Sequence, residues 1–159
     1  MTLMLTLLCR DEADILESML RFHLAQGVDA FIVTDNGSLD DTLPILRRYE
    51  QRGLLELIEE PAQTYAQAVW VTRMAERAAA INADWVIHAD ADEFWIAAQP
   101  GRWLRDVVAQ LPQTEPVYRV QRWNAVLRRR QADLDRIHVG QIRWYDSESR
   151  NSADKPLPP

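Results

Sequence analysis

Apolar runs alternate with amphipathic stretches along the first part of the chain. The apolar runs occupy residues 2–9, 30–34, 54–58 and 84–88. Runs of this kind, closed by polar residues, are typical of strands that are buried on both faces. Between them, apolar residues recur at spacings of three and four, which is the pattern of amphipathic helices. The predicted helices lie between Asp11 and Gly27, over 39–52 and over 65–82.

Four strands alternating with three helices predict an α/β fold with a mainly parallel, Rossmann-like sheet and helices on both faces. In such sheets, ligands bind at the carboxyl ends of the strands. Polar clusters follow three of the predicted strands, at 10–12, 35–38 and 89–93. We therefore expect these clusters to converge on one crevice. Beyond them, the pattern predicts a short helix over 103–111 and one more strand over 117–126.

Length and composition indicate one globular domain. The chain has 159 residues, of which 47% are hydrophobic and 26% charged, and this composition argues against disorder over most of its length. We assign residues 1–146 to that domain. The polar, proline-ended segment 147–159 is interpreted as a loop or flexible tail.

The charge of the chain excludes one class of partner and leaves another open. A formal net charge of -6 argues against nucleic-acid binding, which depends on Lys and Arg that neutralise phosphates. Acidic residues outnumber basic ones over 1–118, whereas basic residues outnumber acidic ones over 119–159. The second part either faces an anion or is a solvated edge.

Cys9 is the single cysteine, so no intrachain disulfide can form and a reducing compartment is expected. We interpret it as a buried, inert thiol. The apolar opening 1–9 is too short for a membrane span and lacks the marks of a signal peptide. The expected location is therefore the cytoplasm, with a peripheral position at the inner face of a membrane left open.

Asp90 and Asp92 stand two residues apart, directly after an apolar strand. On an extended segment such residues point the same way, so both carboxylates can reach one ion. Hard oxygen ligands suit Mg²⁺ or Mn²⁺ that keeps water and substrate phosphates in its other positions. The alternative is a pair of solvated turn aspartates.

The order of these features over residues 3–96 resembles the family-2-type (GT-A) glycosyltransferases, especially the branch with an Asp-Ala-Asp-Glu-Phe signature. The residues that carry the resemblance are the strand ending in Cys-Arg-Asp-Glu, the Thr-Asp-Asn-Gly-Ser turn, the alanine-rich helix and the sequence from Trp85 to Phe94. The resemblance implies a nucleotide-sugar-binding domain of a metal-dependent glycosyltransferase.

The resemblance also implies roles for single residues. Glu12 and Asp35 would contact the nucleoside of the donor, although Asp35 also fits an Asx-turn or a helix N-cap. Asp92 would bind the ion directly, and Asp90 would contact it through water or hold the donor's ribose. From the same clusters, Arg10 and Ala91 complete the predicted donor-binding residues.

No general base can be assigned from the sequence. Glu93, His138, Asp146 and Glu148 are the candidates, and Glu93 also fits a structural contact with a backbone group or an arginine. His23, on the apolar face of the first predicted helix, is interpreted as a core histidine.

The predicted function is transfer of a sugar from a nucleotide-sugar donor, taken to be a UDP-sugar, with inversion and with Mn²⁺ or Mg²⁺. The acceptor is a glycan, a lipid or a protein. Two alternatives remain at this point. One is a non-catalytic remnant that binds a nucleotide-sugar or a protein partner, and the other is a nucleotidyltransferase.

Overall fold

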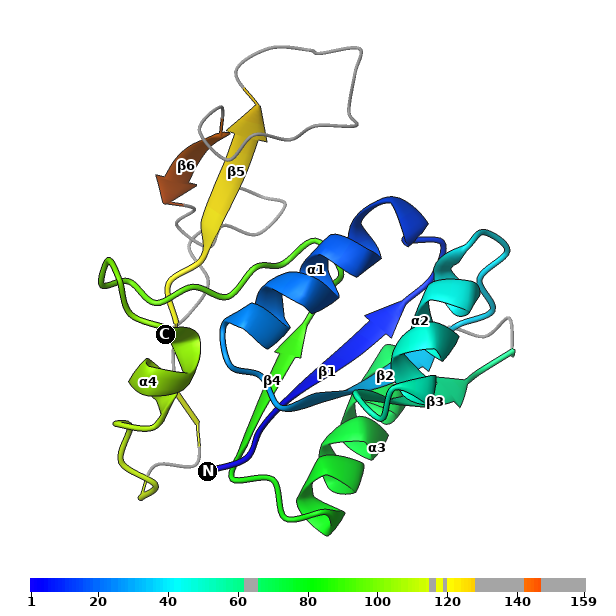
Figure 1. The fold of residues 1–159 in the computed structure, drawn as a ribbon, viewed down its shortest axis with the longest axis horizontal. Helices are drawn as coiled ribbons and strands as arrows, with labels where there is room; N and C mark the ends of the chain where they lie inside the picture. The colour runs from blue at the N-terminus through cyan, green and yellow to red at the C-terminus, as the bar shows by residue number, and fades with distance from the viewer. Residues whose placement is uncertain (62–65, 115–116, 119, 128–141, 147–159) are drawn as a thin grey trace. The chain divides into compact units, whose positions relative to one another are not determined.

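The computed structural model describes residues 1–61, 66–114, 117–118, 120–127 and 142–146 (Figure 1). The chain divides into two compact units, Met1–Leu111 and Pro112–Pro159. The predicted tail 147–159 lies outside the described residues, so its boundary stays a prediction. Within the described ranges, no helix combines the length and the apolar character that a membrane span requires.

The first unit is built on a four-stranded, fully parallel sheet. Its strands are β1 (Leu3–Cys9), β2 (Ala30–Asp35), β3 (Leu55–Glu59) and β4 (Trp85–Ala89). They lie in the order β3-β2-β1-β4, and every neighbouring pair is parallel. Cys9 is paired with Asp35, and Asp35 in turn with Glu59. The carboxyl ends of the strands therefore meet at one edge, and the predicted fold class is confirmed.

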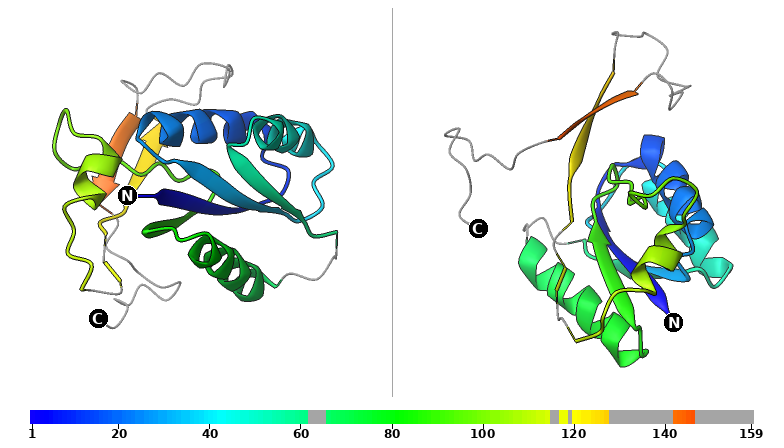
Figure 2. Two further views of the ribbon diagram at one scale, coloured as in Figure 1. Left: turned by 60° about the horizontal axis from the view of Figure 1, so that its bottom comes forward. Right: turned by 90° about the vertical axis from the view of Figure 1, so that its left-hand side faces the viewer.

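Helices cover both faces of this sheet. They are α1 (Ala13–Ala25), α2 (Thr42–Gln51) and α3 (Gln67–Ala80). Figure 2 shows α1 and α2 on one face and α3 on the other. Alternate residues of β1 accordingly belong to different cores, since Leu5 packs with α1 and α2 whereas Met4 packs with Met74 and Ala78 of α3. A strand with apolar neighbours on both sides needs apolar residues at every position, which explains the continuous run over 2–9.

The three long helices end in the same way. Gly27, Gly53 and Asn82 follow α1, α2 and α3 with φ values of 91°, 69° and 59°. In each case the next amide donates to the carbonyl five residues back, as Val28 does to His23 over 3.0 Å. This left-handed end satisfies carbonyls that have no partner inside the helix. The predicted role of Gly27 as a helix stop is confirmed.

The later elements differ from the prediction in length. The helix expected over 103–111 is the shorter α4 (Leu104–Val108). After it, the Gln110 and Leu111 amides donate to carbonyls only three residues back, so the chain continues as turns up to Pro112. The strand expected over 117–126 is β5 (Trp123–Leu127). It pairs antiparallel with β6 (Ile142–Asp146), a strand that was not predicted. These two strands belong to the second unit.

Candidate functional site

A polar pocket lies at the carboxyl edge of the four-stranded sheet. Its volume is about 400 Å³, which is in the range of small-molecule sites. The lining residues come from the ends of β1, β2 and β4 and from the start of α3: Leu8, Cys9, Arg10, Glu12, Asn36, Gln67, Asp90, Ala91 and Asp92. The predicted convergence of the three polar clusters is therefore confirmed.

Gln67 lines this pocket from outside the three polar clusters, and sequence reasoning missed it. It is the first residue of α3, which carries the chain from β3 back to β4. Because a helix in such a crossover runs against the strands, its first residue lies at their carboxyl edge. The predicted topology thus held a signal for Gln67, although nothing in the residue type pointed to it.

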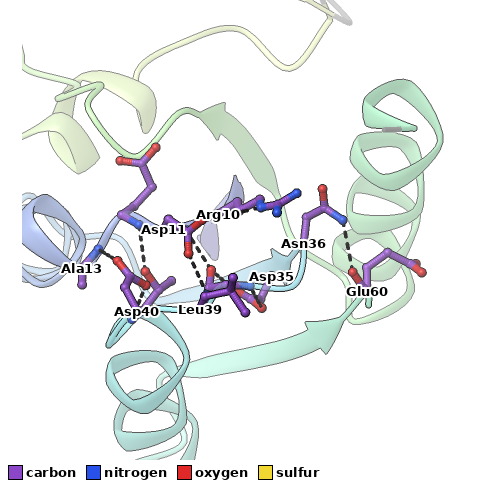
Figure 3. A network of polar contacts seen from close by, with 11 residues as sticks. Arg10, Asp11, Ala13, Asp35, Asn36, Leu39, Asp40 and Glu60 are labelled. Atoms are coloured by element: carbon purple, nitrogen blue, oxygen red, sulfur yellow. Dashed lines mark hydrogen bonds and ion pairs between the residues drawn. The ribbon is translucent and has the colours of Figure 1, made fainter. Parts of the chain in front are cut away.

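The loops after β1 and β2 are tied to each other by hydrogen bonds (Figure 3). The Asp11 amide donates to Ser38 Oγ over 3.0 Å, and Asp11 Oδ1 accepts from the Leu39 amide over 2.7 Å. Ser38 in turn donates to Asp35 from both its amide and its hydroxyl. Asp11 has a φ of 54°, a conformation that is uncommon for a non-glycine residue. The two bonds of Asp11 hold the backbone in this conformation and so fix the position of the next residue, Glu12.

Asp40 joins the beginnings of α1 and α2. Its carboxylate accepts from the Ala13 amide over 3.0 Å and from the Thr42 amide over 2.9 Å. The pKa of Asp40 is lowered by hydrogen bonds, first from the Thr42 side chain and then from the Thr42 and Ala13 amides. The ionised carboxylate accepts from amides at the starts of the helices, which have no partner within the helix. Asp40 therefore acts as a helix-start charge for both helices.

Asp35 itself makes the contacts of a turn residue. Its side chain is 2% exposed, and it accepts two hydrogen bonds from Ser38. The pocket is lined instead by the next residue, Asn36, whose Nδ2 donates to the Glu60 carbonyl over 3.1 Å. Asp35 thus makes a local side-chain-to-backbone contact, with the amide three residues on rather than the two of an Asx-turn, while its contact with a donor stays a prediction.

The loop after β4 presents two carboxylates to the pocket. Asp90 and Asp92 are exposed, whereas Ala91 between them is 3% exposed. Glu93 closes a tight turn, because its amide donates to the Asp90 carbonyl over 3.0 Å and its Oε2 accepts from the Asp90 amide over 3.3 Å. Glu93 therefore makes the structural contact that was weighed against a role as base.

The pocket is electrostatically negative. The pKa of Glu12 is raised, first by burial and then by Asp14, Asp92, Asp40 and Asp90. Arg10 is the one basic residue among the described residues that line the pocket, and its Nε is 3.6 Å from Asp11 Oδ2. Clustered carboxylates of this kind are stabilised by a cation or by protonation.

Cys9 is the only thiol of the chain and lines the same pocket, where it is 4% exposed. Burial raises its pKa far above the usual value, and Asp35, Glu12 and Asp40 raise it further. The thiol is therefore protonated near neutral pH, as expected of the inert cysteine that the sequence predicts.

Among the residues that the structure describes, no three His, Cys, Asp or Glu side chains are arranged to hold a metal by themselves. Asp90 and Asp92, with Glu12 in the same pocket, supply carboxylate oxygens only. Such a set fits Mg²⁺ or Mn²⁺ that takes one or two carboxylates and completes its coordination with water and phosphate. It does not fit a preformed, all-protein cage.

The structure does not test the roles of three of the candidate bases. His138 and Glu148 are outside the described residues. Asp146 is the last residue of β6, in the second unit. Their predicted roles stay predictions.

Comparison with known proteins gives one family. The family model described as Glycosyltransferase family 92 matches residues 10–124, a range that takes in all three polar clusters. A search of the curated proteins finds no match.

Proposed function

This chain belongs to glycosyltransferase family 92, and from that premise we propose that the pocket at the carboxyl edge binds a nucleotide-sugar donor together with a divalent cation. Family membership confirms the predicted glycosyltransferase activity and favours it over nucleotidyl transfer. The closer resemblance to family-2-type, GT-A enzymes and their Asp-Ala-Asp-Glu-Phe signature stays a proposal. A UDP-sugar donor, Mn²⁺ or Mg²⁺ and an inverting outcome are proposed with it.

One observation carries the proposal. Glu12, Asp90 and Asp92 line one pocket and come from strands that are far apart in the sequence. Asp90 and Asp92 suit a cation that is shared between protein and substrate, because two protein carboxylates leave most coordination positions to water and diphosphate. We therefore expect the cation to bind weakly alone and much more tightly with the nucleotide.

The polar residues at the ends of β1, β2 and β4 have proposed tasks in donor binding. Asp92 holds the cation directly, while Asp90 reaches it through water or holds the ribose. Glu12 and Asp35 remain the proposed nucleoside contacts, and Asn36 joins them because it lines the pocket where Asp35 does not. Arg10 and Ala91 complete the donor site, with the Arg10 guanidinium suited to the diphosphate.

The chemistry asks for two further groups. A bound divalent cation would stabilise the charge that develops on the departing nucleoside diphosphate. A base must accept the proton of the acceptor hydroxyl, and for this Glu93, His138, Asp146 and Glu148 remain candidates. The acceptor is proposed to be a glycan, a lipid or a protein. The cytoplasm is the proposed compartment because the chain has a single cysteine.

Calorimetric titration of UDP tests the donor site. UDP is titrated into the protein with Mn²⁺ and with EDTA, and Mn²⁺ is titrated with and without UDP. We expect binding that needs both ligands and that weakens at least tenfold, about 1.4 kcal/mol, in Asp92→Asn. Asp106→Asn is the matched control, because Asp106 is an exposed aspartate in α4, which packs against the opposite end of α1.

Two results would contradict the proposal. UDP that binds equally well in EDTA would exclude the shared cation, and equal losses in both variants would mean that Asp92 has no special part. Incubation of the protein with UDP-sugars and Mn²⁺ then separates an active enzyme from a remnant that binds its donor without transfer.

A further inference from the structure

His23 uses both of its ring nitrogens. It lies on α1 and is fully buried. Its Nδ1 is 2.9 Å from the Met19 carbonyl, and its Nε2 is 3.1 Å from the Trp95 amide. A carbonyl can only accept and an amide N–H can only donate, so Nδ1 carries the proton and Nε2 accepts. The ring is therefore neutral and is held in one tautomer.

The partner of His23 Nε2 follows closely on the carboxylates of the pocket. Trp95 is three residues after Asp92. The intervening Phe94 packs edge-on against Phe22 with ring centroids 5.2 Å apart, and stacks on His23 with centroids 6.1 Å apart. Two aromatic rings of α1 thus pack against Phe94, the residue that follows the acidic loop (residues 90–93).

The acidic loop is consequently held at both ends. Upstream, Ala89 ends β4 and is paired with Leu7 of β1. Downstream, the Trp95 amide is bound to His23. Only residues 90–94 lie between these two points, so a movement of Trp95 away from α1 would be passed to Asp92 through a short piece of chain.

We propose that His23 is a positioning residue for the Asp90 and Asp92 carboxylates, acting through its hydrogen bond to the Trp95 amide. The inference rests on the proposed function, since it concerns the same donor and cation site. It goes beyond the interpretation of His23 as a core histidine, because an apolar side chain of similar size would fill the core without accepting from Trp95.

Two substitutions separate the hydrogen bond from the packing. His23→Leu keeps an apolar filling but removes the acceptor. His23→Gln keeps one group that donates and one that accepts, so it can replace both bonds of the imidazole. Val108→Ala is the control for general destabilisation, because Val108 is a buried residue of α4 in the same core.

The first measurement is the calorimetric affinity for UDP in the presence of Mn²⁺, well below the thermal midpoint of each variant. We expect the dissociation constant to rise about tenfold in His23→Leu and to stay within about threefold of the wild type in His23→Gln and Val108→Ala. Wild-type affinity in a folded His23→Leu would overturn the proposal. A tenfold loss in Val108→Ala would also overturn it, since the effect would then follow from stability alone.

The second measurement needs neither metal nor nucleotide. Amide hydrogen exchange of residues 90–95 should be about tenfold faster in His23→Leu than in the wild type and should be restored in His23→Gln. If the wild type failed to bind UDP with Mn²⁺, the proposed function would fall, and exchange alone would decide the role of His23. Unchanged exchange in His23→Leu would show that His23 does not hold the loop.

Discussion

Replacing Gly27 and Gly53 by alanine should have unequal effects, although the two glycines end their helices alike. Both have a positive φ, of 91° and 69°, and both are followed by the same hydrogen bond to the helix. Their surroundings differ. A Cβ atom at Gly27 would lie 2.6 Å from Arg105 Cβ, whereas a Cβ atom at Gly53 would meet nothing within 4 Å. The pair therefore separates backbone strain from a close contact.

The size of the difference follows from these contacts. Both variants share the cost of a left-handed conformation, about 1–2 kcal/mol for a residue other than glycine. Only Gly27→Ala adds overpacking, which costs about 1–3 kcal/mol. Arg105 cannot easily move aside, because its Nη1 donates to the Gly27 carbonyl over 3.0 Å and to the two Asp29 carboxylate oxygens over 2.7 and 2.8 Å. The closest atom is also a Cβ, which moves only with the backbone of α4.

Urea unfolding followed by far-UV circular dichroism measures this difference. Gly27→Ala should lose about 1–3 kcal/mol more of the free energy of unfolding than Gly53→Ala does. In thermal unfolding, the corresponding gap is about 2–4 °C for each kcal/mol in a chain of this size. Equal midpoints for the two variants would refute the close approach of α4 to Gly27, and a larger loss in Gly53→Ala would refute the reasoning altogether.

Three further results are expected. Asn82→Gly should raise the free energy of unfolding by up to about 1 kcal/mol in the same urea assay, because glycine adopts the φ of 59° without steric cost. Burial lowers the pKa of His23 below its usual 6.5, so between the lowered pKa and pH 6.5 the unfolded chain binds a proton that the folded chain does not. The contribution of His23 to the free energy of unfolding should therefore be complete above pH 6.5 and should fall, by up to about 1.4 kcal/mol per pH unit, as the pH drops from 6.5 to the pKa of the folded state. Urea unfolding of His23→Gln should lack this loss. Cys9, whose thiol pKa is raised by burial, should react with iodoacetamide only after unfolding, as mass spectrometry would show.

The fold could be predicted because the pattern of the first unit is unambiguous. A continuous apolar run such as 2–9 has few solutions other than a strand covered on both faces, and β1 is that strand, in the interior of the sheet. The helix ends expected before Gly27 and at residue 52 lie where the structure has glycines with positive φ, at 27 and 53. The pattern was weaker beyond residue 100, where short elements and prolines leave no long period to read. In that part of the chain the observed helix, α4, is shorter than predicted, and β6 was not predicted.

The location of the site at the carboxyl edge of the sheet could be predicted, but the contacts of its side chains could not. Parallel topology alone brings the ends of β1, β2 and β4 together, and these ends supply most of the lining of the pocket. Which side chain of each cluster turns toward the pocket depends on local hydrogen bonds that sequence does not show. Ser38 binds Asp35 and leaves Asn36 at the pocket, and the crossover from β3 brings in Gln67. The hydrogen bond from the Trp95 amide to His23 could not be predicted either, because Trp95 is distant in sequence.

The carboxylates at the carboxyl edge divide into two groups by what they bind. Asp11, Asp35 and Asp40 accept from backbone amides of the loops and helix starts, so their charge is used to hold the fold. Within the described part of the chain, the carboxylates of Glu12, Asp90 and Asp92 accept no such bond from a loop or helix start, and all three line the pocket.

The difference has an energetic meaning. A carboxylate that caps a backbone amide gains from its charge in the protein alone, whereas Glu12 is destabilised as an anion by burial and by Asp14, Asp92, Asp40 and Asp90. Repulsion of that kind lowers the stability of the free protein and is relieved when a cation enters. Relief of this repulsion would therefore contribute to the binding of the metal-bound diphosphate that we propose for the pocket.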